Sequence, residues 1–118
     1  MIVRTVEEIL DTERDVAGEG WKSRRMVLAK DGLPVSVHET TVEAGTTLRF
    51  CYETYRETVY CIEGRGSLEN VSSGERYDLR PGTLYSVQIG DDHIVRAETD
   101  IKFLCIFDPP LQGTETAD

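Results

Sequence analysis

The sequence predicts an all-β fold, a barrel or sandwich of short strands that follows one short helix. Turn-forming stretches recur along the chain, namely EAGT, EGRG, SSGE, RPGT and IGDD. Between them lie short segments rich in β-branched and aromatic residues, such as TVYCI, RYDL, TLYSVQ and IKFLCIF. Eight or nine short strands at this spacing are typical of a β-sandwich or barrel.

The N-terminal segment carries the helical signal. Thr5 precedes Glu8 by three residues, which is the spacing of a capping box, and the apolar residues that follow Thr5 can share one helix face. We expect a short helix there, preceded by a small strand at residues 2–4. The Asp31-Gly32 pair then predicts a tight hairpin between the segments WKSRRMVLA and PVSVHETTV.

Composition limits the function classes. The chain has 118 residues, 39% of them hydrophobic, which suits a single domain spanning residues 1–118 with one core. Its net charge of −9 argues against a nucleic-acid partner, because phosphates would be repelled. The sequence has neither the roughly 20 consecutive apolar residues that span a bilayer nor a signal peptide. We therefore expect no membrane partner, a cytoplasmic location and reduced cysteines, with Cys51 and Cys61 as small buried residues.

A spaced motif in the middle of the chain matches the frame of metal-binding cupin barrels. That frame reads glycine, five residues, histidine, one residue, histidine, three or four residues, glutamate, six residues, glycine. Starting from Gly45, the frame aligns with Glu57 and Gly64, whereas Cys51 and Glu53 occupy the histidine positions. In the second half of the frame, RPGTLY places Tyr85 where a histidine is usual, and His93 lies on the next segment.

Period-two alternation directs Glu57, Tyr85 and His93 toward the interior, because residues two apart share a strand face. Glu57 shares its strand face with Val59 and Cys61. Tyr85 shares its face with Val87 and Ile89, and His93 with Val95 and Ala97. Leaving three buried polar groups unsatisfied would cost several kcal/mol each, and a shared metal ion satisfies all three. The O, O, N ligand set suits Fe(II), Mn(II) or Zn(II). The alternative is that each residue is an isolated surface or core-edge side chain.

Other polar and aromatic residues leave two interpretations open. Trp21 and Arg25 share a strand face, and without a pocket Trp21 belongs to the core and Arg25 to the surface. His38 is either a pocket residue or an ordinary histidine that is satisfied or exposed. Cys105 and Phe107 share an apolar row, which simple core packing also explains.

Seven motifs, in order and across nearly the whole chain, resemble the ectoine synthases, cupin enzymes that make a compatible solute in salt-stressed bacteria. The motifs are MIVR, GWKSRR, VSVHETTVEAGT, ETVYCIEGRG, LRPGTLYSV, DDHIVRAE and LCIFDPPLQGTE. The resemblance implies a small cupin β-barrel of the jelly-roll type, with a short N-terminal helix. It also implies a cytoplasmic homodimer that holds one Fe(II) per chain.

The resemblance further assigns site residues. It implies that Glu57, Tyr85 and His93 bind the metal. It places these residues in the substrate pocket: Trp21, Arg25, Thr40, Tyr52, Cys105, Phe107 and Glu115. The implied hydro-lyase reaction closes N-γ-acetyl-L-2,4-diaminobutyrate to ectoine with loss of water. Arg25 is expected to anchor the substrate carboxylate, and Glu115 and Tyr52 to carry protons.

The C-terminal segment departs from the family pattern. The end of the chain keeps Glu115 but has Ala117 where the family has a histidine. We expect residues 109–118 to form a mobile tail or partial lid. Two other functions remain open: a related cupin acting on another amide or amidine, such as a ring-opening hydrolase, and a non-catalytic module that binds a small zwitterion.

Overall fold

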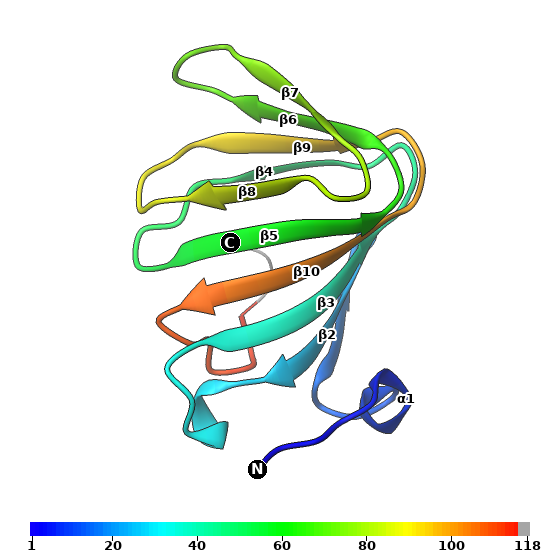
Figure 1. Ribbon diagram of the computed structural model, residues 1–118, viewed down its shortest axis with the longest axis vertical. Coiled ribbons are helices and arrows are strands. Elements are labelled where there is room, and N and C mark those ends of the chain that lie inside the picture. The colour runs from blue at the N-terminus through cyan, green and yellow to red at the C-terminus, as the bar shows by residue number, and fades with distance from the viewer. Residues whose placement is uncertain (116–118) are drawn as a thin grey trace.

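Two antiparallel β-sheets face one another and enclose the core (Figure 1). The computed structural model describes residues 1–115. The elements are α1 Val6–Ile9, β1 Asp15–Gly18, β2 Trp21–Val27, η1 Ala29–Asp31, β3 Ser36–Val42, β4 Thr47–Phe50, β5 Arg56–Glu63, β6 Gly66–Asn70, β7 Arg76–Leu79, β8 Leu84–Val87, β9 His93–Ala97 and β10 Ile101–Asp108. The predicted all-β class with one short helix is thus confirmed.

The strand order is that of a jelly roll, in which neighbours in space are distant in sequence. The larger sheet runs β1-β2-β3-β10-β5-β8, and the smaller runs β4-β9-β6-β7. The last strand, β10, pairs antiparallel with both β3 and β5, so that Cys105 lies opposite His38 on one side and Val59 on the other. The C-terminal strand therefore joins the two halves of the larger sheet.

The interior is formed by the alternation that the sequence predicts. On β5, the side chains of Glu57, Val59 and Cys61 are buried while their neighbours face outward or lie at intermediate depth. On β9 and β10 the same alternation buries His93 and Cys105 in otherwise apolar rows. One companion differs: Ile89 is 48% exposed, because β8 ends at Val87 and the chain turns away before reaching it.

The glycine that ends the first cupin motif is required by close packing. Gly64 has a φ of 96°, which L residues rarely adopt, and a β-carbon added there would lie 2.1 Å from the carbonyl oxygen of Asp100. Any side chain would separate the turn after β5 from the start of β10. The cysteine prediction was half right: Cys61 is buried as expected, whereas Cys51 is exposed in the loop that follows β4.

The predictions for the N-terminal region had mixed outcomes. The capping box between Thr5 and Glu8 is present at α1, but the prediction of a strand at residues 2–4 was wrong, since these residues pair with no sheet and Arg4 contacts β2 and η1 through its side chain. The predicted hairpin between the flanking segments is confirmed, although its turn is longer than two residues. β2 and β3 pair antiparallel, and the carboxylate of Asp31 accepts from the N–H of Leu28, which stabilises the 3₁₀ turn η1 between them.

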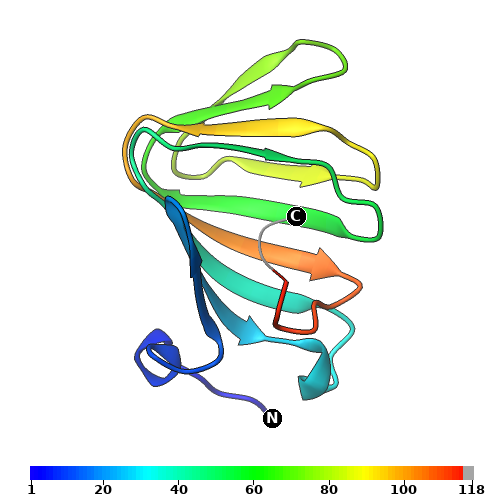
Figure 2. The same cartoon turned by 180° about the vertical axis from the view of Figure 1, so that it is seen from behind.

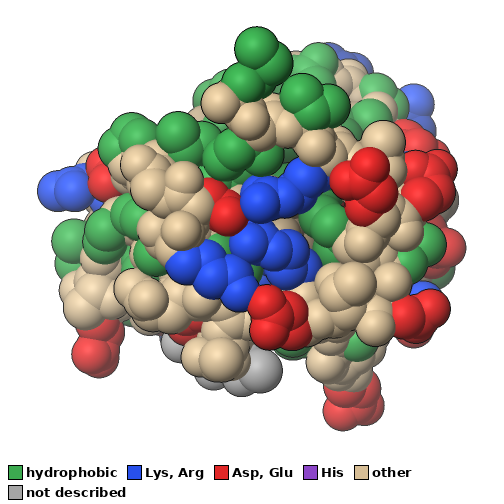
Figure 3. All heavy atoms as spheres, turned by 90° about the horizontal axis from the view of Figure 1, so that it is seen from below, with side chains coloured by type: hydrophobic (Ala, Val, Ile, Leu, Met, Phe, Trp, Pro, Cys, Tyr) green, Lys and Arg blue, Asp and Glu red, His purple; other side chains and the backbone are tan. Residues whose placement is uncertain are grey.

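Asp31 joins the N-terminal segment to the body of the molecule. Its carboxylate accepts hydrogen bonds from the guanidinium groups of Arg4, at 3.0 and 3.1 Å, and Arg14, at 2.9 and 3.0 Å. Only 8% of its side chain is exposed. Basic side chains gather among acidic ones on this end of the molecule (Figure 3). Within residues 1–115, no helix has the length and apolar character needed to cross a membrane.

We expect Asp31→Ala to lower the free energy of unfolding by about 2–4 kcal/mol, because it leaves two guanidinium groups and a backbone N–H without their acceptor. The Arg14 guanidinium, with Arg4 and the Leu28 N–H, holds the pKa of Asp31 well below its usual value. The ionised form therefore stabilises the fold above the ordinary aspartate pKa of about 3.9, and this stabilisation is lost as the pH falls.

Urea unfolding at pH 7 and pH 3 checks this prediction. The difference between wild type and Asp31→Ala is expected to be large at pH 7 and smaller at pH 3. The matched control is Asp78→Ala on β7, since Asp78 is exposed. Equal stability of wild type and Asp31→Ala at pH 7 would show that the ion pairs of Asp31 make no net contribution to the free energy of unfolding.

Candidate active site

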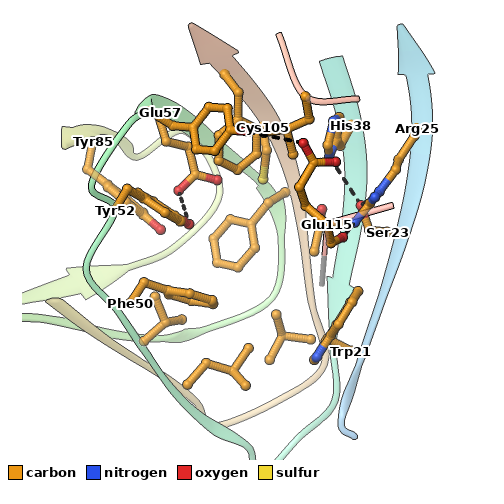
Figure 4. Close-up of a pocket in the computed structure, with 18 residues that line it drawn as sticks. Trp21, Ser23, Arg25, His38, Phe50, Tyr52, Glu57, Tyr85, Cys105 and Glu115 are labelled. Atoms are coloured by element: carbon orange, nitrogen blue, oxygen red, sulfur yellow. Dashed lines mark hydrogen bonds between the residues drawn. The ribbon is translucent and has the colours of Figure 1, made fainter. Parts of the chain in front are cut away.

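A pocket opens between the two sheets, over the inner face of the larger one (Figure 4). It brings together every residue predicted to contact substrate: Trp21, Arg25, Thr40, Tyr52, Cys105, Phe107 and Glu115. Of the three predicted metal ligands, Glu57 and Tyr85 line this pocket. His93 instead lines a second cavity, which it shares with Tyr85.

The pocket floor is a row of residues that crosses five neighbouring strands. The registers place Arg25 opposite His38, His38 opposite Cys105, Cys105 opposite Val59, and Val59 opposite Tyr85. Directly opposed residues on neighbouring strands point to the same face of a sheet. The row therefore carries a cationic group at its β2 end and a phenol at its β8 end.

Glu57 is the buried acid at the β8 end of the pocket. Its side chain is 6% exposed and its Oε1 accepts a hydrogen bond of 3.0 Å from the hydroxyl of Tyr52. Burial raises the pKa of Glu57 to about 7, against the lowering effect of the Tyr52 hydrogen bond. Within residues 1–115 its carboxylate forms no salt bridge. A buried carboxylate without a cation is suited to binding one.

His93 has the protonation pattern of a metal ligand. Its Nδ1 lies 2.8 Å from the carbonyl oxygen of Asp91, and a carbonyl only accepts, so Nδ1 carries the proton. The Nε2 atom therefore has a free lone pair, and it is buried with no hydrogen-bond partner in the described chain. Burial lowers the pKa of His93 and keeps the imidazole neutral. This backbone-oriented tautomer is the one that metal-binding histidines adopt.

Aromatic rings enclose this end of the pocket. The ring centroids of Tyr52 and Tyr85 lie 5.7 and 6.3 Å from that of His93. Burial, followed by the charge of Glu57, raises the pKa of the Tyr85 phenol. Over residues 1–115 no three His, Cys, Asp or Glu side chains cluster closely enough to hold an ion. A metal here therefore needs an oxygen from Tyr85 beside Glu57 and His93, and the orphaned Nε2 and unpaired carboxylate fit that role.

Arg25 defines the opposite end of the pocket. The alternative that it faces solvent is wrong, since it is 2% exposed, and burial lowers its pKa. The guanidinium donates to the carbonyl oxygen of Gly113 at 2.7 Å and to that of Glu115. It makes no salt bridge with a carboxylate in residues 1–115. A buried cation whose hydrogen-bond partners are all neutral favours an anionic ligand.

The segment after β10 folds back over the inner face of the larger sheet, where Figure 2 shows it lying over β3. Leu111 anchors it, donating its N–H to Ser36 Oγ at 3.1 Å and accepting from the N–H of Ala29 at 2.9 Å. Residues 109–115 thus cover the Arg25 end of the pocket. Ala117, where the family has a histidine, lies outside the described residues.

Glu115 holds this segment in a turn. Its carboxylate accepts from the N–H groups of Gln112 and Gly113, both at 2.8 Å, and from the hydroxyl of Tyr55 at 3.1 Å. Partial burial raises the pKa of Glu115, but the backbone N–H groups outweigh it and lower the pKa to about 2. Glu115 is therefore a fixed anion at neutral pH.

Some pocket residues were not predicted from the sequence. Ser23 lies between Trp21 and Arg25 on the same strand face, so period-two alternation could have identified it. Tyr55 comes from the irregular loop between β4 and β5, where no periodicity applies. Leu111 follows the proline pair after β10 and enters the pocket only because the chain turns back. His38, whose place was left open, is buried in the pocket wall.

Comparisons with known proteins agree with this geometry. The sequence profile of the ectoine synthase family matches residues 1–118. The chain is 49% identical to the L-ectoine synthase of Nocardia farcinica, over 100% of this chain and 90% of that protein. It is 45% identical to the L-ectoine synthase of Desulfosudis oleivorans, over 100% of this chain and 92% of that protein.

Solved structures give the same result. The crystal structure of ectoine synthase from P. lautus superposes with a TM-score of 0.93 at 43% identity, covering 98% of this chain and 83% of that one. An RmlC-like cupin from Shewanella frigidimarina, at a TM-score of 0.68 and 16% identity, shares the fold alone, over 80% of this chain and 81% of its own. The chain therefore belongs to the ectoine synthase family, cupin-fold lyases of ectoine biosynthesis.

Proposed function

We propose that the protein closes N-γ-acetyl-L-2,4-diaminobutyrate to ectoine with loss of water, and that it does so with a bound Fe(II). The observation that carries this proposal is the polarity of the pocket row. A buried, anion-seeking Arg25 lies at one end, and Glu57 and Tyr85 lie at the other, with His93 beside them. A substrate with a carboxylate at one end and an acetamide at the other matches that arrangement.

The reaction needs a folded substrate more than a strong reagent. The α-amine nitrogen attacks the carbonyl carbon of the acetamide in the same molecule, and a new C–N bond closes a six-membered ring. The C–O bond then breaks, and the oxygen leaves as water with two protons that come from the nitrogens. Well-aligned intramolecular pairs reach effective molarities of about 10⁵ M or more. Holding the bent conformer is therefore the main task of the pocket.

Glu57, Tyr85 and His93 would hold the metal. When bound, a divalent metal ion supplies Lewis acidity, which makes an amide carbonyl a better electrophile. The mixed carboxylate, phenol and imidazole set also accepts Zn(II) or Mn(II). Two groups described above support this assignment: the Glu57 carboxylate, which is buried without a cation, and His93 Nε2, which has no hydrogen-bond partner in residues 1–115.

The remaining side chains position the substrate and move protons. Burial, together with the negative charge of Glu57, raises the pKa of Tyr52 and keeps its hydroxyl protonated, so Tyr52 is suited to deliver a proton to the departing oxygen. Glu115, as a fixed anion, is better suited to pair with the substrate amine than to exchange protons. Trp21 and Phe107 provide apolar walls that exclude water, which favours net dehydration.

We further propose that the enzyme acts in the cytoplasm during osmotic stress, where a compatible solute accumulates. The three free cysteines fit a reducing compartment.

The Tyr85→Phe variant tests the site and the reaction together. We expect purified wild type with Fe(II) to convert N-γ-acetyl-L-2,4-diaminobutyrate to ectoine, followed by NMR, and to bind about one iron per chain. Because Tyr85→Phe lacks the phenol oxygen, we expect it to lose stoichiometric iron, and its turnover to fall by about 100-fold or more. Iron content is measured by elemental analysis.

The control is Tyr60→Phe on the outer face of β5, where the tyrosine is 44% exposed. Full iron content in Tyr85→Phe would contradict the ligand assignment. Turnover of other amides alone would indicate a related cupin with a different substrate. Tight binding of the substrate without turnover would indicate a binding module.

Tyr52→Phe separates proton transfer from metal binding. Because Tyr52 contacts Glu57 without being a proposed ligand, we expect iron content to be retained while kcat falls by about 10²-fold or more. Steady-state kinetics with a parallel iron measurement checks this. An unchanged kcat would exclude Tyr52 as the proton donor.

We also propose that the protein is a homodimer, formed through the outer face of the larger sheet. On that face, Tyr60, Ile62 and Leu84 are 44%, 41% and 61% exposed, and Tyr60 lies directly opposite Leu84. An exposed apolar cluster of this kind is typical of an interaction surface. We expect light scattering to give twice the 13.3 kDa chain mass for wild type and the single chain mass for the Tyr60→Asp/Leu84→Asp variant.

Tyr77→Asp serves as the control, since Tyr77 is exposed on β7 in the other sheet. A monomeric wild type, or a double variant that stays dimeric, would overturn the assignment of this face.

A further inference from the structure

His38 is a buried pocket residue whose ring nitrogens have unequal partners. It is 2% exposed and packs against Phe107, with ring centroids 5.2 Å apart. Its Nδ1 lies 3.2 Å from Ser23 Oγ, whereas its Nε2 is buried and has no hydrogen-bond partner in residues 1–115. Figure 4 shows Ser23 and His38 beside Arg25, at the end of the pocket away from Tyr85. The reaction described above makes no use of either residue.

The neighbours of Ser23 determine which nitrogen of His38 carries the proton. Arg25 Nε donates to Ser23 Oγ over 3.5 Å, and a guanidinium has no acceptor. The serine hydroxyl hydrogen is then free to point at His38 Nδ1, and we infer that Nδ1 accepts it. The proton of the neutral imidazole therefore resides on Nε2.

The ring stays neutral in this environment. Burial, followed by the positive charge of Arg25, lowers the pKa of His38 to about 3, against the opposing charge of Glu115. Nε2–H is thus a neutral donor that no described residue accepts. Leaving such a donor buried and unpaired is unfavourable. A ligand oxygen would remove that penalty.

We propose that His38 Nε2–H, oriented by Ser23, donates a hydrogen bond to the substrate carboxylate beside Arg25, and so makes the pocket selective for ligands that carry this group. The inference rests on the proposed function and extends it. Arg25 and His38 are directly opposed on neighbouring strands, so their side chains point to the same face of the sheet. One carboxylate can therefore accept hydrogen bonds from both. His38 is then a specificity residue and Ser23 a positioning residue.

The tautomer can be measured without any ligand. The chain contains only two histidines, so ¹⁵N-histidine labelling of metal-free protein gives two resolvable rings, assigned with a His38→Gln variant. We expect His38 to be protonated at Nε2 and His93 at Nδ1, since their hydrogen-bond partners differ. In Ser23→Ala we expect the His38 preference to weaken while His93 is unchanged. Protonation of His38 at Nδ1 in wild type would overturn the inference.

Calorimetry then tests selectivity, with metal-free protein preventing turnover. The probes are N-γ-acetyl-L-2,4-diaminobutyrate and N-acetyl-1,3-diaminopropane, which is the same molecule without its carboxylate. We expect His38→Leu to weaken binding of the first by on the order of ten- to a hundredfold and to leave the second unchanged. We expect His38→Gln, which keeps an N–H donor at a similar reach, to recover most of the loss.

The outcomes separate the two proposals. If wild type binds the acetylated diaminobutyrate and folded His38→Leu binds it equally well, or if both probes weaken alike, this inference alone fails. If wild type neither binds nor cyclises that substrate, the proposed function fails and this inference with it. If His38→Leu does not fold, Ser23→Ala is measured in its place. We expect Ser23→Ala to weaken binding of the acetylated diaminobutyrate by a smaller factor and to leave binding of N-acetyl-1,3-diaminopropane unchanged. Equal weakening for both probes would contradict the proposal.

Discussion

The register of β10 between β3 and β5 is the constraint on which the site depends. It aligns Arg25, His38, Cys105, Val59 and Tyr85 in one inward-facing row, although these residues come from widely separated parts of the chain. A shift of β10 by one residue would turn Cys105 and the other inward-facing side chains of that strand to the opposite face. The rigidity of a six-stranded sheet therefore sets the distance between the Arg25 end of the pocket and the Tyr85 end.

Both ends of that row carry charges that the fold alone does not satisfy. Glu57 is buried without a cation, and Arg25 is buried against neutral carbonyl groups. Each arrangement destabilises the empty protein relative to apolar packing. Such sites persist where a ligand compensates them, and in our proposal the compensating groups are a metal ion at one end and a carboxylate at the other. The same buried charges that destabilise the free protein would therefore contribute to its affinity for the substrate.

The two histidines illustrate how hydrogen-bond partners decide chemical role. His93 donates through Nδ1 to a backbone carbonyl and presents a lone pair, as a metal ligand must. In our proposal, His38 accepts at Nδ1 from the Ser23 hydroxyl and presents an N–H, as a carboxylate donor must. Both rings are buried and neutral, so burial does not distinguish them. The difference comes from one neighbouring atom in each case.

The sequence by itself determined the all-β class, the capped helix, the inward-facing positions of Glu57 and His93, and the family, because alternation, caps and ordered motifs are local properties. Tertiary structure decided the rest. Burial of Arg25 depends on the segment after β10, which folds back and covers it. Asp31 links the N-terminal segment to the rest of the fold because Arg4 and Arg14 both donate to its carboxylate. The histidine tautomers likewise depend on atoms that only folding brings together, and no local pattern encodes such contacts.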